Sequence, residues 1–246
     1  MNRPQQALEC QAFEGFLATI SPFNATLMNV RLFLFDLDGT LVDTSPDLAL
    51  AVNMVRTARG IAPLPEKELR PYASKGAPGL LGKAMNISRS DPAFPVLRAE
   101  FLDNYAAHMT DHSRPFEGVT AMLDALRCAG VRTGVVTNKV EHLALRLTSA
   151  LGLDRKLNIV LGSDSEGCAM KPAPDSLITA ARLLGIHTTQ ILYAGDDPRD
   201  VQAAHAAGMQ CAACTWGYAL TPPETWDADF IAHSPADLAA WAGLAL

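Results

Sequence analysis

Short apolar runs of strand length alternate with longer helical patterns along most of this chain. The runs that predict strands lie at 31–36, 131–136, 158–161, 191–194, 210–215 and, more weakly, 229–232. The helical patterns between them lie at 118–129, 140–152, 174–185 and 198–207. This alternation predicts an α/β fold, in which helices cover both faces of a parallel sheet.

One gap in this pattern is far too long for a single helix. About 95 residues separate the first predicted strand from the second. The segment between them has helical patterns at 46–59, 66–73, 78–86 and 92–111. We therefore predict a helical cap at 46–114, inserted into a catalytic core made of 30–45 and 115–246. The hinges are expected near Thr44–Ser45 and Arg114–Pro115.

The composition limits the partners that the chain can have. Its 246 residues carry a net charge of −6 and no Lys/Arg block longer than a pair. Nucleic acids and anionic membranes attract clustered positive charge, so we expect neither as a partner. No apolar run reaches the roughly 18 residues of a membrane span. We expect a small-molecule substrate and a monomer or homodimer.

Cysteine usage and the N-terminal segment favour a cytoplasmic location. Five cysteines, an odd number, are scattered through a chain too large to need disulfide bonds for its stability. Cys211 and Cys214 lie in a predicted strand, where residues three apart point to opposite faces, which argues against a shared metal or redox site. Residues 1–29 lack the pattern of a signal peptide, and we expect a poorly ordered leader there.

Polar residues follow the predicted strands at the points where the strands end. The segments FDLDGT, VVTNK and YAGDDPRD close three strands, and CAMKPAPD, with Lys171 at the start of a helix, follows another. In parallel sheets ligands bind beyond the carboxyl ends of the strands. The candidate site residues are Asp36, Asp38, Gly39, Thr40, Thr137, Asn138, Lys171, Asp196, Asp197 and Asp200.

Carboxylates gathered at one edge repel one another unless a cation lies among them. Oxygen ligands without a His/Cys cluster predict a hard divalent ion, most plausibly Mg²⁺. A metal, a lysine and a hydroxyl together suit a phosphoryl group. Asp36, at the end of a rigid strand, could attack phosphorus, and Gly39 allows the sharp turn that follows it. Asp38 could then act as general acid and base.

The motifs DLDGTLVD, VVTN, KPAPD and GDDPRD, in this order, resemble those of the haloacid dehalogenase superfamily. The resemblance extends from Val30 to the C-terminus. It implies a Rossmann-like core with an inserted helical cap, an Asp36 nucleophile and an Asp38 acid/base. It also implies Mg²⁺ ligands at Asp36, the backbone carbonyl of Asp38 and Asp196. The resemblance further implies phosphate binding by Thr137, Asn138 and Lys171. It implies that Asp200 holds Lys171 or a metal-bound water. The role of Asp197, where many members carry Ser, is left unassigned.

Within the superfamily, the chain is similar to two groups of phosphatases. Most of it resembles the bacterial phosphoglycolate phosphatases. The stretches RPYASKGAPGLL and WDADFIAHSPADLAAW are closer to a group that removes phosphate from N-acetylmuramic acid 6-phosphate. The resemblance thus implies a Mg²⁺-dependent hydrolase of a small anionic phosphate monoester, with the alcohol left open.

In the predicted cap, Lys75 and Gly76 form a candidate anion clamp, because a lysine beside a glycine at a helix start can reach toward a substrate. The alternative for Lys75 is a solvated loop lysine. Thr137 and Asn138 could instead be helix N-caps, and Asp197 and Asp200 could serve the positive end of a helix dipole. The six histidines show no metal-ligand spacing.

Three other functions share part of this pattern. A dehalogenase of the same fold lacks the acid two residues after the nucleophile, so Asp38 argues against it. A phosphomutase has the same motifs and returns the phosphoryl group to its substrate. A receiver-type signalling module also gathers Asp, Thr and Lys around Mg²⁺, but it has about half this length and no cap.

Overall fold

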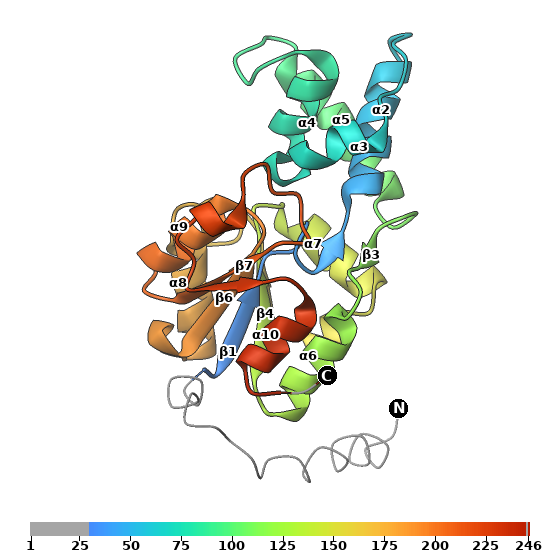
Figure 1. Cartoon of the computed structure of the whole chain (residues 1–246). Coiled ribbons are helices and arrows are strands. Elements are labelled where there is room, and N and C mark those ends of the chain that lie inside the picture. Colours follow the sequence, from blue (N-terminus) through green and yellow to red (C-terminus); the bar gives the residue numbers. More distant parts are fainter. Residues whose placement is uncertain (1–29, 245) are drawn as a thin grey trace.

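The computed structural model of the protein describes residues 30–244 and Leu246. The predicted leader at 1–29 lies outside the described residues. Six parallel strands form one sheet in the order β5-β4-β1-β6-β7-β8 (Figure 1). The strands are β1 (Leu32–Phe35), β4 (Arg132–Val136), β5 (Ile159–Leu161), β6 (Ile191–Gly195), β7 (Gln210–Cys214) and β8 (Phe230–Ala232). The parallel α/β fold predicted from the alternating pattern is confirmed.

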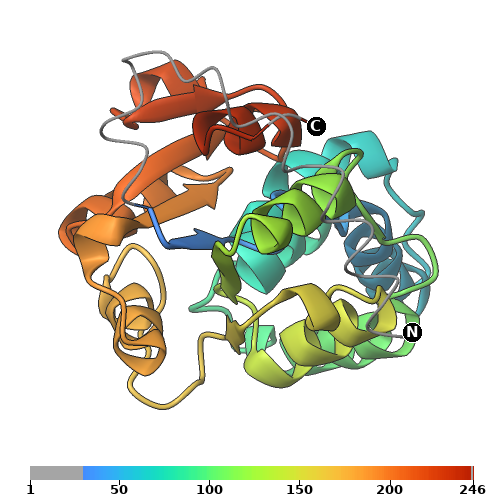
Figure 2. The same ribbon diagram turned by 90° about the horizontal axis from the view of Figure 1, so that it is seen from below.

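The sheet is covered by helices on both faces (Figure 2). Phe33 and Phe35 of β1 pack in one apolar cluster, while Leu32 and Leu34, which point the other way, pack in a second. All four side chains are fully buried, as expected for a central parallel strand. The first cluster includes α6 (Val119–Cys128), α7 (Glu141–Ala150) and α10 (Pro235–Trp241), and the second includes α8 (Asp175–Leu184) and α9 (Pro198–Ala206).

The last helix, α10, was not predicted, although its start carries a recognisable signal. Ser234 accepts a hydrogen bond from the Asp237 backbone, and Asp237 accepts one from the Ser234 backbone. This reciprocal capping box satisfies two backbone donors at the helix start.

Within the described residues, no helix combines the length and the apolar character needed to cross a bilayer.

Four helices stand together at one end of the sheet, in the segment expected to form the cap (Figure 1). They are α2 (Ser45–Thr57), α3 (Glu66–Leu69), α4 (Gly76–Met85) and α5 (Phe94–His108). The helix predicted at 66–73 is wrong in extent, because α3 ends at Leu69 and a 3₁₀ helix follows at Arg70–Lys75. Pro71 has no backbone N–H to continue an α-helix.

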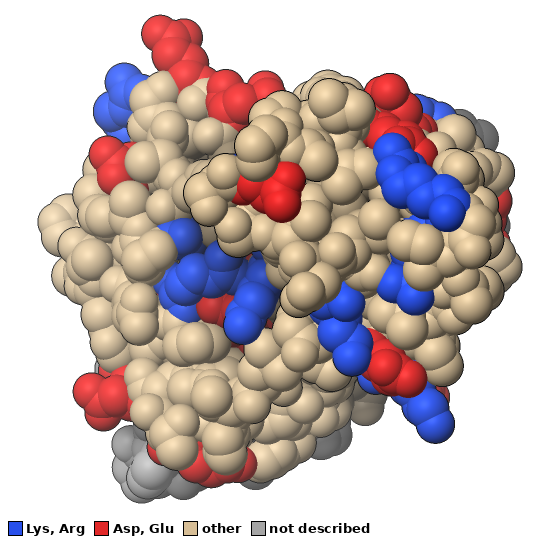
Figure 3. Space-filling view, turned by 90° about the horizontal axis from the view of Figure 1, so that it is seen from above, with Lys and Arg blue, Asp and Glu red and all other residues tan. Residues whose placement is uncertain are grey.

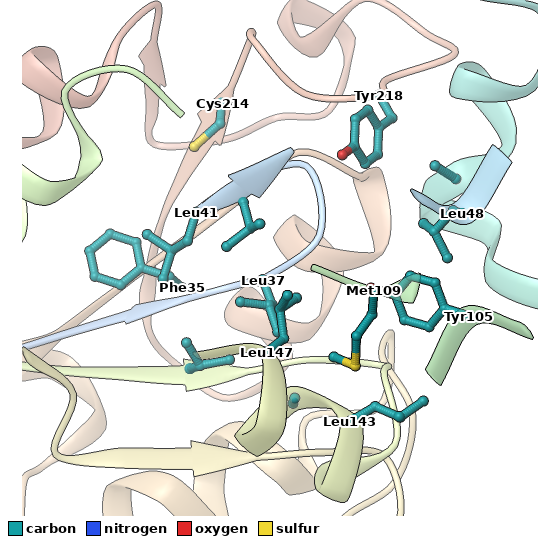
Figure 4. Close-up of a cluster of buried hydrophobic side chains, with 14 of the residues drawn as sticks. Phe35, Leu37, Leu41, Leu48, Tyr105, Met109, Leu143, Leu147, Cys214 and Tyr218 are labelled. Carbon is teal, nitrogen blue, oxygen red and sulfur yellow. The ribbon is translucent and has the colours of Figure 1, made fainter. Parts of the chain in front are cut away.

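The two chain crossings between the cap and the core pair with each other. The short strands β2 (Val42–Asp43) and β3 (Arg114–Pro115) form an antiparallel ladder at this boundary. An apolar seam reinforces it: Leu37 lies between Phe35 of the sheet and Met109 beside the cap (Figure 4). All three belong to one buried cluster that continues into the cap.

A buried carboxylate also connects these two chain crossings by hydrogen bonds. Asp47, near the start of α2, accepts hydrogen bonds from the backbone N–H of His112 at 3.0 Å and of Ser113 at 2.7 Å. The Ser113 hydroxyl donates a further one at 2.7 Å. Burial raises the pKa of Asp47, but the hydrogen bonds from Ser113 and His112 outweigh it and leave the pKa below its usual value. The ionised carboxylate therefore stabilises the folded chain.

We predict that Asp47→Asn lowers the free energy of unfolding by about 2 kcal/mol at pH 7, because hydrogen bonds to a charged acceptor are lost. A carboxylate whose folded pKa is lowered contributes fully above its unfolded pKa of about 3.9, and the contribution disappears as pH falls through the folded pKa. Urea unfolding between pH 7 and pH 3 measures this difference. A difference that is constant over the whole range, or absent at pH 7, would contradict the assignment.

Candidate active site

The candidate site lies at the carboxyl ends of three adjacent strands. Asp36 follows β1 directly, Thr137 follows β4, and Asp196 follows β6. Because β1 lies between β4 and β6, the side chains that leave these strands meet at one edge of the sheet. The topology therefore brings together residues that are far apart in the sequence.

Lys171 lies among the carboxylates of this edge. Its ammonium nitrogen is 3.1 Å from Oδ1 of Asp36 and 2.6 Å from Oδ1 of Asp200. Tyr193, on β6, accepts a further hydrogen bond from the same nitrogen at 2.6 Å. Burial lowers the pKa of Lys171, but Asp200 and Asp36 raise it above its usual value, so the lysine is positively charged. Lys171 lies in the loop before α8, and not at the helix start as predicted.

Asp196 is fully buried and held by three donors. The Thr40 hydroxyl donates to Oδ1 at 2.9 Å, and the backbone N–H of Tyr218 donates to Oδ2 at 2.9 Å. Ser74, from the cap, donates to Oδ2 at 3.3 Å. The carboxylate is thereby fixed by groups from two segments of the core and one of the cap.

Three of these carboxylates could hold a metal ion. One oxygen each of Asp36, Asp196 and Asp200 lies within 4.8 Å of the other two, close to the about 4.2 Å that separates opposite ligands of Mg²⁺. Burial and the neighbouring carboxylates raise the pKa of Asp36 to about 6 and that of Asp196 to about 8. The single positive charge of Lys171 does not neutralise the negative charge of three ionised carboxylates. A hard divalent cation suits these oxygen ligands. Asp38 contributes no side-chain oxygen to this group.

Asp38 makes a separate set of contacts. Lys139 donates to both of its carboxylate oxygens at 3.0 and 3.1 Å, and the Thr44 hydroxyl donates at 2.6 Å. Lys139 also donates to the hydroxyl of Tyr105, on α5 of the cap, at 2.9 Å. The prediction missed Lys139, although it directly follows Thr137 and Asn138 in the segment VVTNK.

Thr137 and Asn138 differ in what their side chains do. Thr137 is buried, lines the cavity described below, and accepts a hydrogen bond from the Lys139 backbone. The Asn138 side chain exchanges two hydrogen bonds with the backbone of Lys171, at 2.7 and 3.1 Å. Asn138 thus holds the loop that carries Lys171.

Asp197 and Asp200 form the start of α9. Asp197 accepts from the Arg199 backbone, and Asp200 accepts from the Asp197 backbone, which is a capping box. The Asp197 carboxylate also pairs with the Arg199 guanidinium at 2.7 Å. Arg199, which sequence reasoning missed, donates in turn to the carbonyl of Ser74 in the cap at 2.7 Å. Asp197 therefore orients a side chain that joins the core to the cap.

A cavity of about 290 Å³ lies between this edge and the cap. Asp36, Asp38 and Lys171 line its core side, while Lys75 and Gly76 line its cap side. Lys75 is exposed, and its ammonium lies 5.9 Å from the centre of the Tyr72 ring. Seen from the cap side, Lys and Arg side chains gather around a hollow in which acidic atoms are visible (Figure 3). The cavity thus has acidic side chains on its core side and basic side chains on its cap side.

We predict that Gly39→Ala lowers turnover about 100-fold, because displacing a reacting group by about 1 Å has an effect of this size. Gly39 has φ +88°, and an added Cβ would overlap the carboxylate of Asp196. Gly60→Ala is the matched control, since Gly60 has φ +68° but nothing within 4 Å of an added Cβ. Both variants should lose about 1 kcal/mol of stability because of the positive φ, and Gly39→Ala should lose more because of the overlap. Equal activities of the two variants would contradict the prediction.

Comparisons with known proteins agree on the family. Residues 33–214 match the family of haloacid dehalogenase-like hydrolases. The chain is 42% identical to the phosphoglycolate phosphatase of Xylella fastidiosa (strain Temecula1 / ATCC 700964) over 83% of this chain and 90% of the relative. It is 36% identical to the N-acetylmuramic acid 6-phosphate phosphatase of Pseudomonas aeruginosa, over 86% of this chain and 94% of the relative.

The fold has close counterparts among solved structures. A predicted phosphoglycolate phosphatase from Haemophilus somnus 129PT superposes with a TM-score of 0.78 at 29% identity, over 86% of this chain and 97% of that one. The strand ends that carry Asp36, Thr137 and Asp196 lie within the matched residues. The protein is a phosphoric monoester hydrolase that belongs to the haloacid dehalogenase-like hydrolase family.

Proposed function

We propose that the protein is a Mg²⁺-dependent phosphatase that hydrolyses a small anionic phosphate monoester through an aspartyl phosphate on Asp36. The observation that carries this proposal is the convergence of Asp36, Asp196 and Asp200 around one point, with Lys171 in contact with two of them. The odd number of cysteines supports a cytoplasmic location.

In the first half of the proposed reaction, a carboxylate oxygen of Asp36 attacks phosphorus. A new P–O bond forms, and the bond from phosphorus to the alcohol oxygen breaks. Asp38 enters this half of the reaction protonated and donates its proton to that leaving oxygen. Lys171 and the backbone beside Thr137 lie where they can hold the phosphoryl oxygens, because both line the cavity next to Asp36.

In the second half, water attacks the phosphorus of the aspartyl phosphate and releases inorganic phosphate. Asp38 takes up a proton from the water as the P–O bond to Asp36 breaks, so the carboxylate of Asp36 is regenerated. The hydrogen bonds from Lys139 and Thr44 hold the Asp38 carboxyl group in place for both proton transfers.

The proposed Mg²⁺ would be held by Asp36, Asp196 and the backbone carbonyl of Asp38, with Asp200 close by. When bound, it would neutralise charge on the phosphoryl oxygens and on the carboxylates that meet there. The contact of Asp200 with Lys171, at 2.6 Å, supports a role for Asp200 in fixing the lysine. Lys75 and Gly76 would contact the part of the substrate that enters the cap.

One observation favours N-acetylmuramic acid 6-phosphate as a second candidate substrate. A cavity of about 290 Å³ is near the lower end of the range for sugar-sized or drug-sized ligands, about 300–1,000 Å³. A two-carbon acid such as phosphoglycolate would fill only part of this space. A sugar phosphomutase remains a third candidate, and release of inorganic phosphate in a single turnover distinguishes it from a phosphatase.

We predict that Asp36→Asn lowers phosphate release by roughly 1,000-fold or more, because the amide is a poor nucleophile. The substitution removes a charge from a crowded acidic site, so the fold should keep its stability. Steady-state release of phosphate from p-nitrophenyl phosphate, together with thermal unfolding, measures both effects. A stable variant with wild-type turnover would exclude the proposed mechanism.

We further predict that Mg²⁺ binds more tightly as pH rises from 6 to 8 and that binding releases protons. The pKa values of Asp36 and Asp196, raised to about 6 and about 8 without metal, mean that Asp196 is largely protonated over most of this range and Asp36 is partly protonated at its lower end. A metal needs the ionised form, so affinity should rise by up to about tenfold per pH unit for each proton released. Calorimetry in buffers of different ionisation enthalpy tests this. An affinity that does not change with pH would count against the site.

A further inference from the structure

We propose that Arg98, assisted by Arg89, binds a second acidic group of the substrate, at the far end of the alcohol from the phosphate. This inference rests on the proposed phosphatase function and names the class of ester that the same cavity accepts. The substrate is a sugar-sized phosphate monoester that carries a carboxylate or another anion remote from phosphorus. Four features of the cavity support this assignment.

One face of α5 forms a wall of the cavity. Phe94, Arg98, Phe101 and Tyr105 all line it, and their spacing of three or four residues places them along one side of the helix. Phe94, Phe101 and Tyr105 are buried, whereas Arg98 is exposed between the two phenylalanines. The wall therefore offers one cation in an otherwise aromatic surface.

The position of Arg98 along α5 sets a distance from the reacting groups. Tyr105 marks the end of the helix near the core, because its hydroxyl contacts Lys139, which contacts Asp38. Arg98 lies seven residues earlier, about 10 Å along the helix axis toward the far end of the cap. Helical side chains lean toward the helix N-terminus, which favours a guanidinium position away from the reacting groups.

Arg98 and Arg89 have no acidic partner among the residues that the structure describes. In contrast, the cations close to the reacting groups are paired: Lys139 with Asp38, Lys171 with Asp36 and Asp200, and Arg199 with Asp197. Both arginines line the same cavity, Arg89 from the loop after α4 and Arg98 from α5. Two unpaired arginines that line one cavity favour an anionic ligand.

These features exclude a short acid as the best fit. In phosphoglycolate the carboxylate oxygens lie only about 5 Å from phosphorus, which is about half of the ~10 Å that separates Arg98 from Tyr105 along the helix axis. A sugar ring between the two acidic groups supplies the missing length. It would also pack against the apolar side chains that line the middle of the cavity, which include Phe101, Leu102, Val140 and Leu143.

The test compares two sugar esters that differ in one lactyl group, which carries the remote acid. N-Acetylmuramic acid 6-phosphate carries a lactyl carboxylate, which N-acetylglucosamine 6-phosphate lacks. We expect the wild type to favour the acidic ester at least about tenfold in kcat/KM, because a charge-assisted hydrogen bond has an effect of this size. Arg98→Ala should abolish this preference, mainly through KM. Arg98→Lys should restore part of it, and Arg155→Ala, an exposed arginine outside the cavity, should keep it.

Several results would overturn the proposal. It fails if the wild type hydrolyses both sugar esters equally, or if Arg98→Ala weakens turnover of phosphoglycolate as much as that of the acidic sugar ester. If the wild type hydrolyses no ester, including p-nitrophenyl phosphate, the proposed function itself fails. Calorimetry of N-acetylmuramic acid 6-phosphate with Asp36→Asn protein, with and without Arg98→Ala, measures binding independently of turnover. An affinity that does not depend on Arg98 would contradict the inference.

Discussion

The site depends on excess negative charge that the fold gathers and buries at one edge of the sheet. Asp36, Asp196 and Asp200 converge there, and the ammonium of Lys171 neutralises only part of their charge. Carboxylates in such a place are costly unless positive charge and hydrogen bonds compensate them. Thr40, Tyr193 and the backbone of Tyr218 supply hydrogen bonds to this group. A buried, oxygen-rich centre that lacks positive charge can bind both a divalent cation and a transferring phosphoryl group.

The cap is fastened to the same centre by polar contacts. The Ser74 hydroxyl donates to Asp196 and the Ser74 carbonyl accepts from Arg199, so one cap residue contacts both the end of β6 and the start of α9. The Tyr218 hydroxyl accepts hydrogen bonds from the backbone N–H groups of Thr44 and Ser45, at the start of α2. The position of the cap is therefore linked to the geometry of the carboxylates. A substrate that enters the cavity meets both layers at once.

Much of this arrangement could be predicted from the sequence, because the alternation of strands with helices and the carboxylates at strand ends are local patterns. In a parallel sheet, such strand-end carboxylates meet at one edge. The strands and the large insertion were recognised in this way. The contacts of Lys139, Arg199 and Tyr218 could not be predicted, because each joins segments that only the tertiary fold brings together. The break at Pro71 could have been recognised from its missing N–H. Arg98 is one of several exposed arginines in the sequence, and only the face of α5 distinguishes it.

The central claim is that the carboxylate of Asp36 accepts the phosphoryl group. An aspartyl phosphate is an acyl phosphate, and borohydride reduces it to homoserine, whereas a free carboxylate does not react. The most direct measurement is mass spectrometry of the protein quenched during turnover with substrate and Mg²⁺ and then treated with borohydride. The account predicts homoserine at position 36, dependent on substrate and absent in Asp36→Asn protein. Homoserine at another aspartate, or none at any position during active turnover, would contradict it.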